Sequence, residues 1–271
     1  MHIFRTILST VLVAMMALPV EAQSEGGLIA GAEAEKKLTN KLSVNVEAEL
    51  RTRNNFKTMD RWNLGLGVEY KFTKWLKANA GYQLLHYNNR EKTEYYTTYE
   101  SDGTTVKNHK VHWRPSYWGA KHRFYVSLTS TYKFANNIRV SLRERWQYSY
   151  RPSKATERWT WRTNADGTTA DDYALRLDDD YVRSASGKNQ LRSRFQIEYD
   201  KKRALLTPYA SVELFNSWKV EKVRYTVGTD IRLSKQHSLG VYYRFQKMHN
   251  VEADDYDPDM HYLGVGYKFK F

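Results

Sequence analysis

A strict alternation of apolar and polar residues runs through most of this chain and constrains its fold more than any other feature. In residues 42–51, every second residue from Leu42 to Leu50 is apolar, and the residues between them are polar or charged. Because successive side chains of a β-strand point to opposite faces, this segment predicts a strand with one apolar and one charged face.

The alternation recurs along the chain, and it predicts eleven strands in all. Each is long enough to cross a bilayer when tilted by about 45°. Strands of soluble sheets usually have about five to six residues, and a soluble core could not absorb so many charges. We therefore predict an all-β fold, a closed antiparallel transmembrane β-barrel of about 10–12 strands. The segments are residues 28–38, 42–51, 61–72, 75–87, 121–134, 138–151, 190–201, 205–217, 223–233, 237–247 and 260–271.

The connections between these segments are of two kinds, as in bacterial barrels, which have short periplasmic turns and long extracellular loops. The long connections, residues 88–121 and 151–189, are rich in Tyr, Trp, Thr and charge. They contain Asp-Gly turn signals, so we expect neighbouring strands to extend into them as a hairpin above the membrane. The short connections resemble one another and are residues 38–42, 72–76, 134–138 and 233–237.

The direction of the first strand raises a question of parity. If residues 38–42 form a periplasmic turn, the first strand enters from outside, whereas an exported N-terminus starts in the periplasm. Three arrangements would resolve this. Residues 23–30 thread the lumen, or they form a further strand, or the barrel closes with an odd number of strands.

The first residues predict a secretory signal peptide, residues 1–22. Arg5 precedes an apolar run from Ile7 to Pro19, and Val20-Glu21-Ala22 is a small-x-small-like cleavage site. We expect cleavage near Ala22, a barrel over residues 23–271, and a location in the bacterial outer membrane. No later segment offers about twenty consecutive apolar residues, so no transmembrane helix is expected.

Composition excludes several classes of function. The absence of Cys removes disulfides, a lipoprotein attachment thiol and thiolate chemistry. A net charge of +13 and a mean hydropathy of −0.74 would suit a soluble nucleic-acid binder, but the signal peptide argues against a nucleic-acid partner. A barrel reconciles this hydrophilicity with an aromatic content of 14%, because aromatic girdles lie at both membrane interfaces.

The charged faces of the strands predict a lumen charge network of mixed sign. One interpretation is an interior held together by ion pairs and hydrogen bonds. The other is an arginine-lined, anion-preferring pore, since rings of Arg and Lys favour anions. The predicted network comprises Glu47, Glu49, Arg51, Glu69, Arg123, Arg143, Arg145, Arg192, Arg194, Glu198, Glu213, Arg224, Asp230, Arg232 and Arg244.

Glu144 breaks the alternation, because its place between Leu142 and Trp146 aims it at lipid. A carboxylate in hydrocarbon is costly, so we expect Glu144 near an interface or beside a bulge.

No catalytic, cofactor or metal site is predicted. Outer strand ends and loops carry acids and imidazoles that could activate water or bind a cation, but none has a recognised ligand or triad spacing. The histidines are His86, His109, His112, His122, His249 and His261. The acids are Asp171, Asp172, Asp178, Asp179, Asp180, Asp254, Asp255, Asp257 and Asp259.

The last segment, Leu263–Phe271, resembles the C-terminal signal by which the barrel-assembly machinery recognises outer-membrane barrels. That signal is a Gly followed by two spaced aromatic residues, and Gly266, Phe269 and Phe271 fit it. The resemblance implies this machinery as a partner.

Four further segments resemble the domain-of-unknown-function family numbered 2490, which is common in Bacteroidetes. They are residues 33–39, 47–53, 60–67 and 70–77. The resemblance would cover nearly all of the mature chain. It implies an outer-membrane barrel and supplies no active site.

Three functions follow as hypotheses. The first is an envelope-structural or binding role carried by the extracellular loops, with outer-membrane lipid and lipopolysaccharide as partners and an unknown small-molecule ligand. Basic and aromatic loop residues could meet lipopolysaccharide phosphates or glycans. The second is a small anion-preferring channel, and the third is an outer-membrane hydrolase with a site on the extracellular rim. The loop residues are Lys107, Lys110, Trp113, Arg114 and Trp118.

Overall fold

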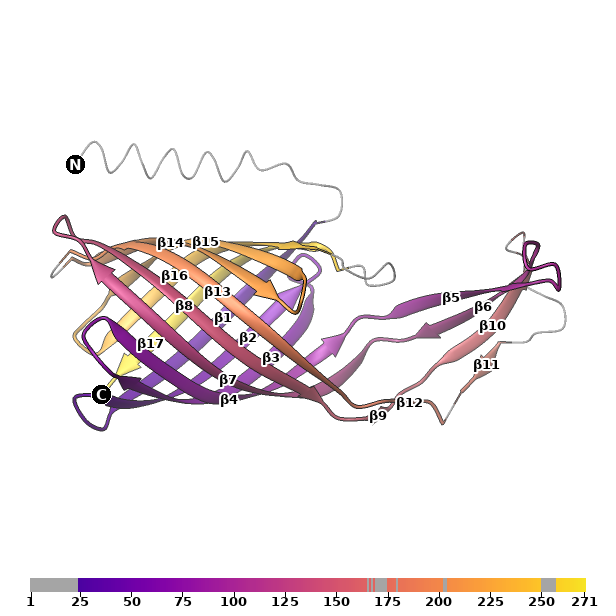
Figure 1. Ribbon diagram of the computed structural model, residues 1–271, viewed down its shortest axis with the longest axis horizontal. Coiled ribbons are helices and arrows are strands. Elements are labelled where there is room, and N and C mark those ends of the chain that lie inside the picture. The colour runs from indigo at the N-terminus through magenta and orange to yellow at the C-terminus, as the bar shows by residue number, and fades with distance from the viewer. Residues whose placement is uncertain are drawn as a thin grey trace.

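Long strands dominate this computed structural model, which describes residues 24–164, 166, 168, 175–178, 180–201, 204–249 and 257–271. Within those residues, eleven strands form a closed barrel in the order β1-β17-β16-β15-β14-β13-β8-β7-β4-β3-β2 (Figure 1). The predicted signal peptide lies outside the described residues. The barrel strands are β1 (Ser24–Lys37), β2 (Leu42–Arg53), β3 (Thr58–Lys71), β4 (Leu76–Asn89), β7 (Tyr117–Lys133), β8 (Ile138–Arg151), β13 (Ser186–Tyr199), β14 (Leu206–Asn216), β15 (Val220–Arg232), β16 (His237–Met248) and β17 (Asp259–Lys270).

Each of the eleven predicted segments corresponds to one barrel strand, so the closed barrel is confirmed. The seam between the first and last strands is parallel, from Ser24 opposite Asp259 to Glu35 opposite Lys270. Every other neighbouring pair in the barrel is antiparallel, as predicted. An odd number of strands therefore resolves the parity question. In the described residues no helix is long and apolar enough to cross a membrane.

The two faces of the strands differ as the alternation predicted. Leu66 is 60% exposed, and Phe124, Val126 and Leu128 each expose about half of their surface on the outside of the barrel. Apolar side chains this exposed on a closed barrel form the band that contacts lipid.

The short turns connect neighbouring strands at one end of the barrel, which we call the short-turn end. In three of them a hydroxyl at the second position accepts hydrogen bonds from two backbone amides, which stabilises the turn locally. These hydroxyls belong to Thr39, Thr73 and Ser234. The fourth turn has Ala135 at that position and instead places Asn137 at a φ of 65°. Asn tolerates this left-handed conformation better than most residues.

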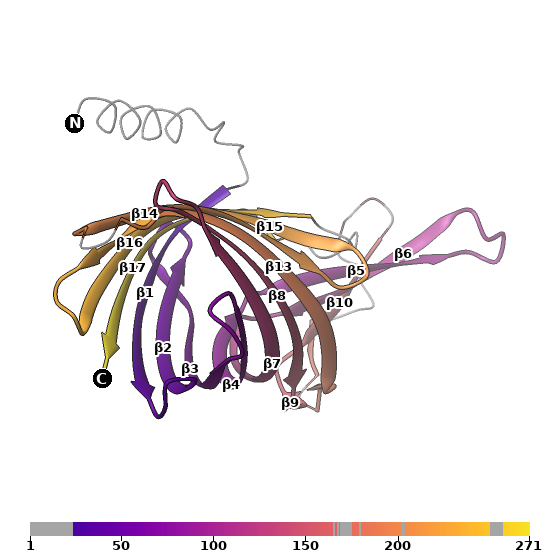
Figure 2. The same ribbon diagram turned by 60° about the vertical axis from the view of Figure 1, so that its left-hand side comes forward.

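The long connections at the opposite end, the long-loop end, contain a second sheet that projects away from the barrel (Figures 1 and 2). The predicted hairpin is present. The sequence did not predict that β6 also pairs with β10. This pairing joins the two long connections. We call this four-stranded sheet, in the order β11-β10-β6-β5, the projecting sheet. Its strands are β5 (Lys92–Tyr99), β6 (Val106–Arg114), β10 (Trp159–Asn164) and β11 (Arg176–Leu177), and below it β9 (Lys154–Ala155) pairs with β12 (Val182–Arg183).

Glu144 lies in the middle of β8, and the strand has no bulge there, so the expectation of a bulge was wrong. The strand pairs without a register shift on both sides, with Glu144 opposite Ser193 on one neighbour and Leu128 on the other. The Ser193 hydroxyl donates a 2.6 Å hydrogen bond to the Glu144 carboxylate. That bond compensates part of the cost of a polar group on an apolar face.

Candidate functional site in the barrel lumen

A single carboxylate, Glu213 on β14, gathers three arginines from three other strands. It lies 2.5 Å from Arg143 on β8, 2.9 Å from Arg192 on β13 and 3.7 Å from Arg224 on β15. All four side chains are at most 14% exposed. Three guanidinium groups therefore share one negative charge, and little of any of the four side chains is exposed.

Phe215 follows Glu213 by two residues and so points to the same side of β14. The residue is 2% exposed. The charged ends of Arg192, Lys222 and Arg224 lie 4.5, 4.7 and 4.4 Å from the ring centre. The negative face of an aromatic ring attracts cations, so Phe215 offsets part of their mutual repulsion without neutralising them.

Several lumen cations have no carboxylate at ion-pair distance among the described residues. They use neutral partners instead. Arg123 donates to the Ser149 hydroxyl, and Arg145 lies 4.2 Å from the Tyr125 ring. The Nε atoms of Arg145 and Arg194 are buried without a hydrogen-bond partner. The lumen cations without a carboxylate at ion-pair distance among the described residues are Arg123, Arg145, Arg194, Lys222 and Arg244.

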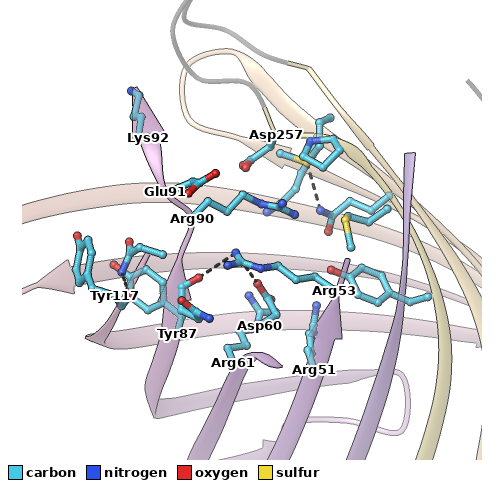
Figure 3. Close-up of a pocket in the computed structure, with 18 of the residues that line it drawn as sticks. Arg51, Arg53, Asp60, Arg61, Tyr87, Arg90, Glu91, Lys92, Tyr117 and Asp257 are labelled. Atoms are coloured by element: carbon cyan, nitrogen blue, oxygen red, sulfur yellow. Dashed lines mark hydrogen bonds and ion pairs between the residues drawn. The ribbon is translucent and has the colours of Figure 1, made fainter. Parts of the chain in front are cut away.

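Two cavities of about 500 and 490 Å³ follow one another inside the barrel. The first, the mouth cavity, opens toward the long-loop end, where Figure 3 shows arginines of β2 and β3 and Arg90 gathered around it. The second, the lumen cavity, lies deeper. Four residues line both cavities, and we call them the shared cations: Arg51, Arg61, Lys222 and Arg224.

Positive charge exceeds negative charge in both cavities. Nine Arg or Lys side chains and three Asp or Glu side chains line the mouth cavity, and eleven and five line the lumen cavity, counted over the described residues. Ion pairs offset part of this excess: the Glu49 carboxylate lies 2.5 Å from Arg51 and 3.9 Å from Arg61. Arg224 also donates a 2.8 Å hydrogen bond to Gln246. The remaining surplus gives both cavities an attraction for anions.

Most residues of the predicted lumen charge network line the lumen cavity, and three lie elsewhere. Glu69 pairs with Lys77 at 2.8 Å, Glu198 pairs with Arg139, and Arg232 is exposed. The cavity-lining members are Glu47, Glu49, Arg51, Arg123, Arg143, Arg145, Arg192, Arg194, Glu213, Arg224, Asp230 and Arg244.

Sequence reasoning missed two of the four shared cations. Arg61 lies on the polar face of its strand and could have been included in the predicted lumen charge network. Lys222 was missed because the predicted strand began at residue 223, whereas β15 begins at Val220. Its spacing of two from Arg224 was the available signal.

The terminal residues are joined to the first strand. The backbone N–H of Phe271 donates to the carbonyl of Glu35, and the N–H of Lys37 donates to the carbonyl of Phe271. The rings of Phe269 and Phe271 stack at 5.0 Å, and Gly266 lines the lumen cavity.

The histidines expected at strand ends and loops have aromatic or hydroxyl neighbours. His86 stacks on Trp118 at 5.0 Å, while His122 and His261 hydrogen-bond to Tyr82 and Tyr243. No group of three or more potential metal ligands occurs in the part of the chain that the structure describes. The other histidines are His109, beside Thr97, His112, beside Tyr96, and His249, whose amide donates to Glu221. Several of the acids lie outside the described residues: Asp171, Asp172, Asp179, Asp254 and Asp255.

A closed barrel with an apolar outer band and a charged interior defines the class: the protein is a transmembrane β-barrel of the bacterial outer membrane. It belongs to the family described as "Protein of unknown function (DUF2490)", whose model matches residues 30–257.

Two solved structures are similar to the chain. The beta domain of the Bordetella autotransporter BrkA is 13% identical with a TM-score of 0.50, and the match covers 93% of this chain and 100% of that one. The translocator domain of the autotransporter NalP from Neisseria meningitidis is 8% identical with a TM-score of 0.27, over 90% of each chain. The first likeness supports the barrel fold. A comparison with curated proteins gives no match.

Proposed function

We propose that the protein is an anion-preferring channel for small solutes in the outer membrane. The observation that carries this proposal is the set of shared cations between the two cavities. Arg51, Arg61, Lys222 and Arg224 stand where a solute would pass from the mouth cavity into the lumen cavity. Cationic rings select anions because the desolvated charges attract negative and repel positive ions.

The competing interpretation is a lumen held closed by ion pairs. It requires about as many carboxylates as cations, and the described residues that line the lumen cavity include eleven Arg or Lys and only five Asp or Glu. Glu213 serves three arginines, and Lys222 has the Phe215 ring as its charge-stabilising neighbour. Buried cations without counter-charges are costly, so mobile anions in the cavities would stabilise this interior.

Planar-bilayer recording of the purified full chain tests the channel. In a KCl gradient the reversal potential should show chloride preference, and Arg61→Gln/Lys222→Gln should shift it toward equal permeability. Lys107→Gln/Arg176→Gln removes the same charge from exposed positions on the projecting sheet and should leave it unchanged. A correctly folded barrel, verified by heat-modifiable gel mobility, that stays silent in the bilayer would exclude the channel.

Export and assembly complete the proposal. Residues 1–22 act as a cleaved signal peptide, and Gly266, Phe269 and Phe271 are presented to the barrel-assembly machinery. The long-loop end is extracellular, where lipopolysaccharide is the neighbouring lipid. Support comes from the seam, since the predicted assembly signal pairs with β1 and closes the barrel.

A second candidate function is binding by the projecting sheet. Its edge strand β5 leaves Tyr95, Tyr96 and Tyr99 at least half exposed. Tyrosines on an unpaired strand edge are typical of surfaces that recognise other molecules. Binding of the purified protein to whole envelopes, compared between the native chain and Tyr95→Ser/Tyr99→Ser, tests it, and equal binding would reject it.

A further inference from the structure

A third cavity of about 200 Å³ lies at the long-loop end beside the mouth cavity, with which it shares Tyr87, Tyr117 and Arg183, and we call it the rim cavity. It lies where β4, β7 and β8 meet the short β9–β12 pair. Four of its lining residues can carry positive charge: His86, Arg151, Lys154 and Arg183. Among the described residues that line it, none is acidic.

Two of these cations face each other directly. Lys154 and Arg183 are cross-strand partners in the β9–β12 ladder, and each lies 5.8 Å from the centre of the Tyr117 ring. Like charges directly opposite one another destabilise a strand pair. A pair of only two residues per strand has few backbone hydrogen bonds to oppose that repulsion, so an anion between the two cations would stabilise it.

The hydrogen-bond partners of the three permanently charged groups are all neutral. Arg151 donates to the carbonyl of Ser184 at 3.1 Å, Lys154 to the carbonyl of Trp118, and Arg183 to the side chain of Asn89 at 3.0 Å. The Nε of Arg151 is buried without any partner. Because this atom is buried, a ligand in the rim cavity would meet the terminal nitrogens of Arg151 instead.

Other cations on the outside of the protein do have carboxylate partners. On the projecting sheet, only a short distance along the chain, Arg114 lies 2.6 Å from Glu94 and Arg158 lies 2.8 Å from Asp178. At the short-turn end, Lys77 pairs with Glu69. These three cations each have a carboxylate partner, whereas Arg151, Lys154 and Arg183 around the rim cavity have none within ion-pair distance among the described residues.

Aromatic side chains of the outward face lie beside the cavity. Trp118 and His86 stack beside it, with their ring planes 14° apart, on the same outward face as the lipid-contacting Phe124. Trp side chains gather at the level of lipid headgroups in barrels. A group bound in the rim cavity would therefore be at headgroup height.

We propose that the rim cavity binds a phosphate monoester or phosphate ion through Arg151, Lys154 and Arg183. Two guanidinium groups and an ammonium group provide the bidentate and single charge-assisted hydrogen bonds that a phosphate dianion accepts. An N–H of the His86 ring would add a further donor. The source of the phosphate is either a lipid A headgroup of the surrounding leaflet or soluble phosphate.

The test uses the purified full chain in detergent and native mass spectrometry with diphosphoryl lipid A. The native protein should retain one lipid A molecule, and Arg151→Gln/Lys154→Gln should weaken retention by roughly tenfold or more. These two residues line neither the mouth cavity nor the lumen cavity, so conductance should not change. Lys107→Gln/Arg176→Gln is the charge-matched control and should retain lipid A normally.

Two further probes distinguish the sources of phosphate. If the ligand is a headgroup, dephosphorylated lipid A should bind like the double variant, and millimolar inorganic phosphate should not displace the lipid. If the ligand is soluble phosphate, isothermal titration with inorganic phosphate should give saturable binding that the double variant loses. The proposal is overturned if neither diphosphoryl lipid A nor inorganic phosphate distinguishes the native protein from Arg151→Gln/Lys154→Gln.

Discussion

The carboxylate of Glu25 accepts hydrogen bonds of 2.8 Å from both terminal nitrogens of Arg90. The backbone N–H of Asn54 donates a third, of 3.0 Å. This contact fixes the start of β1, where the parallel seam begins, to the connection between β4 and β5. Two further side chains hold this part of β1: the Gly26 N–H donates to the Asn55 side chain and the Leu28 N–H to the Thr52 hydroxyl, both at 2.9 Å.

Arg90→Gln should therefore loosen the start of the seam. We expect a loss of about 1 kcal/mol in local stability, because the ion pair is bidentate but partly exposed. Hydrogen–deuterium exchange of residues 24–28 measures it. Adding Glu25→Gln to Arg90→Gln should cost little more, since the contact is already lost, and fully additive effects would contradict the assignment.

Glu213→Gln should strongly destabilise the barrel. It leaves Arg143, Arg192 and Arg224 without their common counter-charge, and breaking a buried ion pair typically costs about 3–5 kcal/mol. Urea unfolding in detergent measures the effect. Glu69→Gln is the control, because its partner Lys77 is 40% exposed and such pairs contribute about 0–1 kcal/mol. Equal midpoints for both variants would contradict the shared role of Glu213.

Glu144→Leu should stabilise the protein in a membrane. The substitution removes a carboxylate from the lipid-facing side of β8, and the expected gain is on the order of 1–2 kcal/mol. It also leaves the Ser193 hydroxyl without its acceptor, which reduces the gain. Unfolding in lipid vesicles, with Ser193→Ala as the comparison, tests this, and a less stable Glu144→Leu would indicate that the carboxylate has a partner beyond Ser193.

The projecting sheet should weaken in acid. Burial, together with the charge of Arg158, lowers the pKa of His112 below its ordinary 6.5. The Thr160 hydroxyl and the Arg158 ion pair lower the pKa of Asp178 below 3.8. A group with a depressed pKa contributes stability above its unfolded pKa and loses that contribution as the pH falls through its folded one.

Two steps should follow, one below pH 6.5 from His112 and one below pH 3.8 from Asp178. Near-ultraviolet circular dichroism of the cross-strand pair Trp113 and Trp159 reports on the sheet. His112→Phe should remove the first step and Asp178→Asn the second. A signal that does not change with pH while the barrel stays folded would reject this account.

The barrel strands were predictable because their information is local. From Leu42 to Leu50 the chain alternates with period two, and this alone places each side chain on the lipid or the lumen side. The repeated turn chemistry of Thr39, Thr73 and Ser234 was likewise visible, although their paired amide hydrogen bonds were not.

The projecting sheet and the candidate sites were less predictable. β6 and β10 belong to different connections, and nothing in either segment specifies the pairing of Trp113 with Trp159. Twelve of the fifteen residues predicted for the lumen charge network line the lumen cavity. Their pairing was not predicted, because Glu213 meets arginines that are distant in sequence.

The sequence by itself determined that this chain forms strands with one lipid-facing and one charged face, since that depends only on which residue follows which. Tertiary structure decided how the barrel closes, with a parallel seam of β1 and β17, and which cations are left without a carboxylate. Closure and charge pairing depend on distances between strands, and a one-dimensional pattern does not contain those distances.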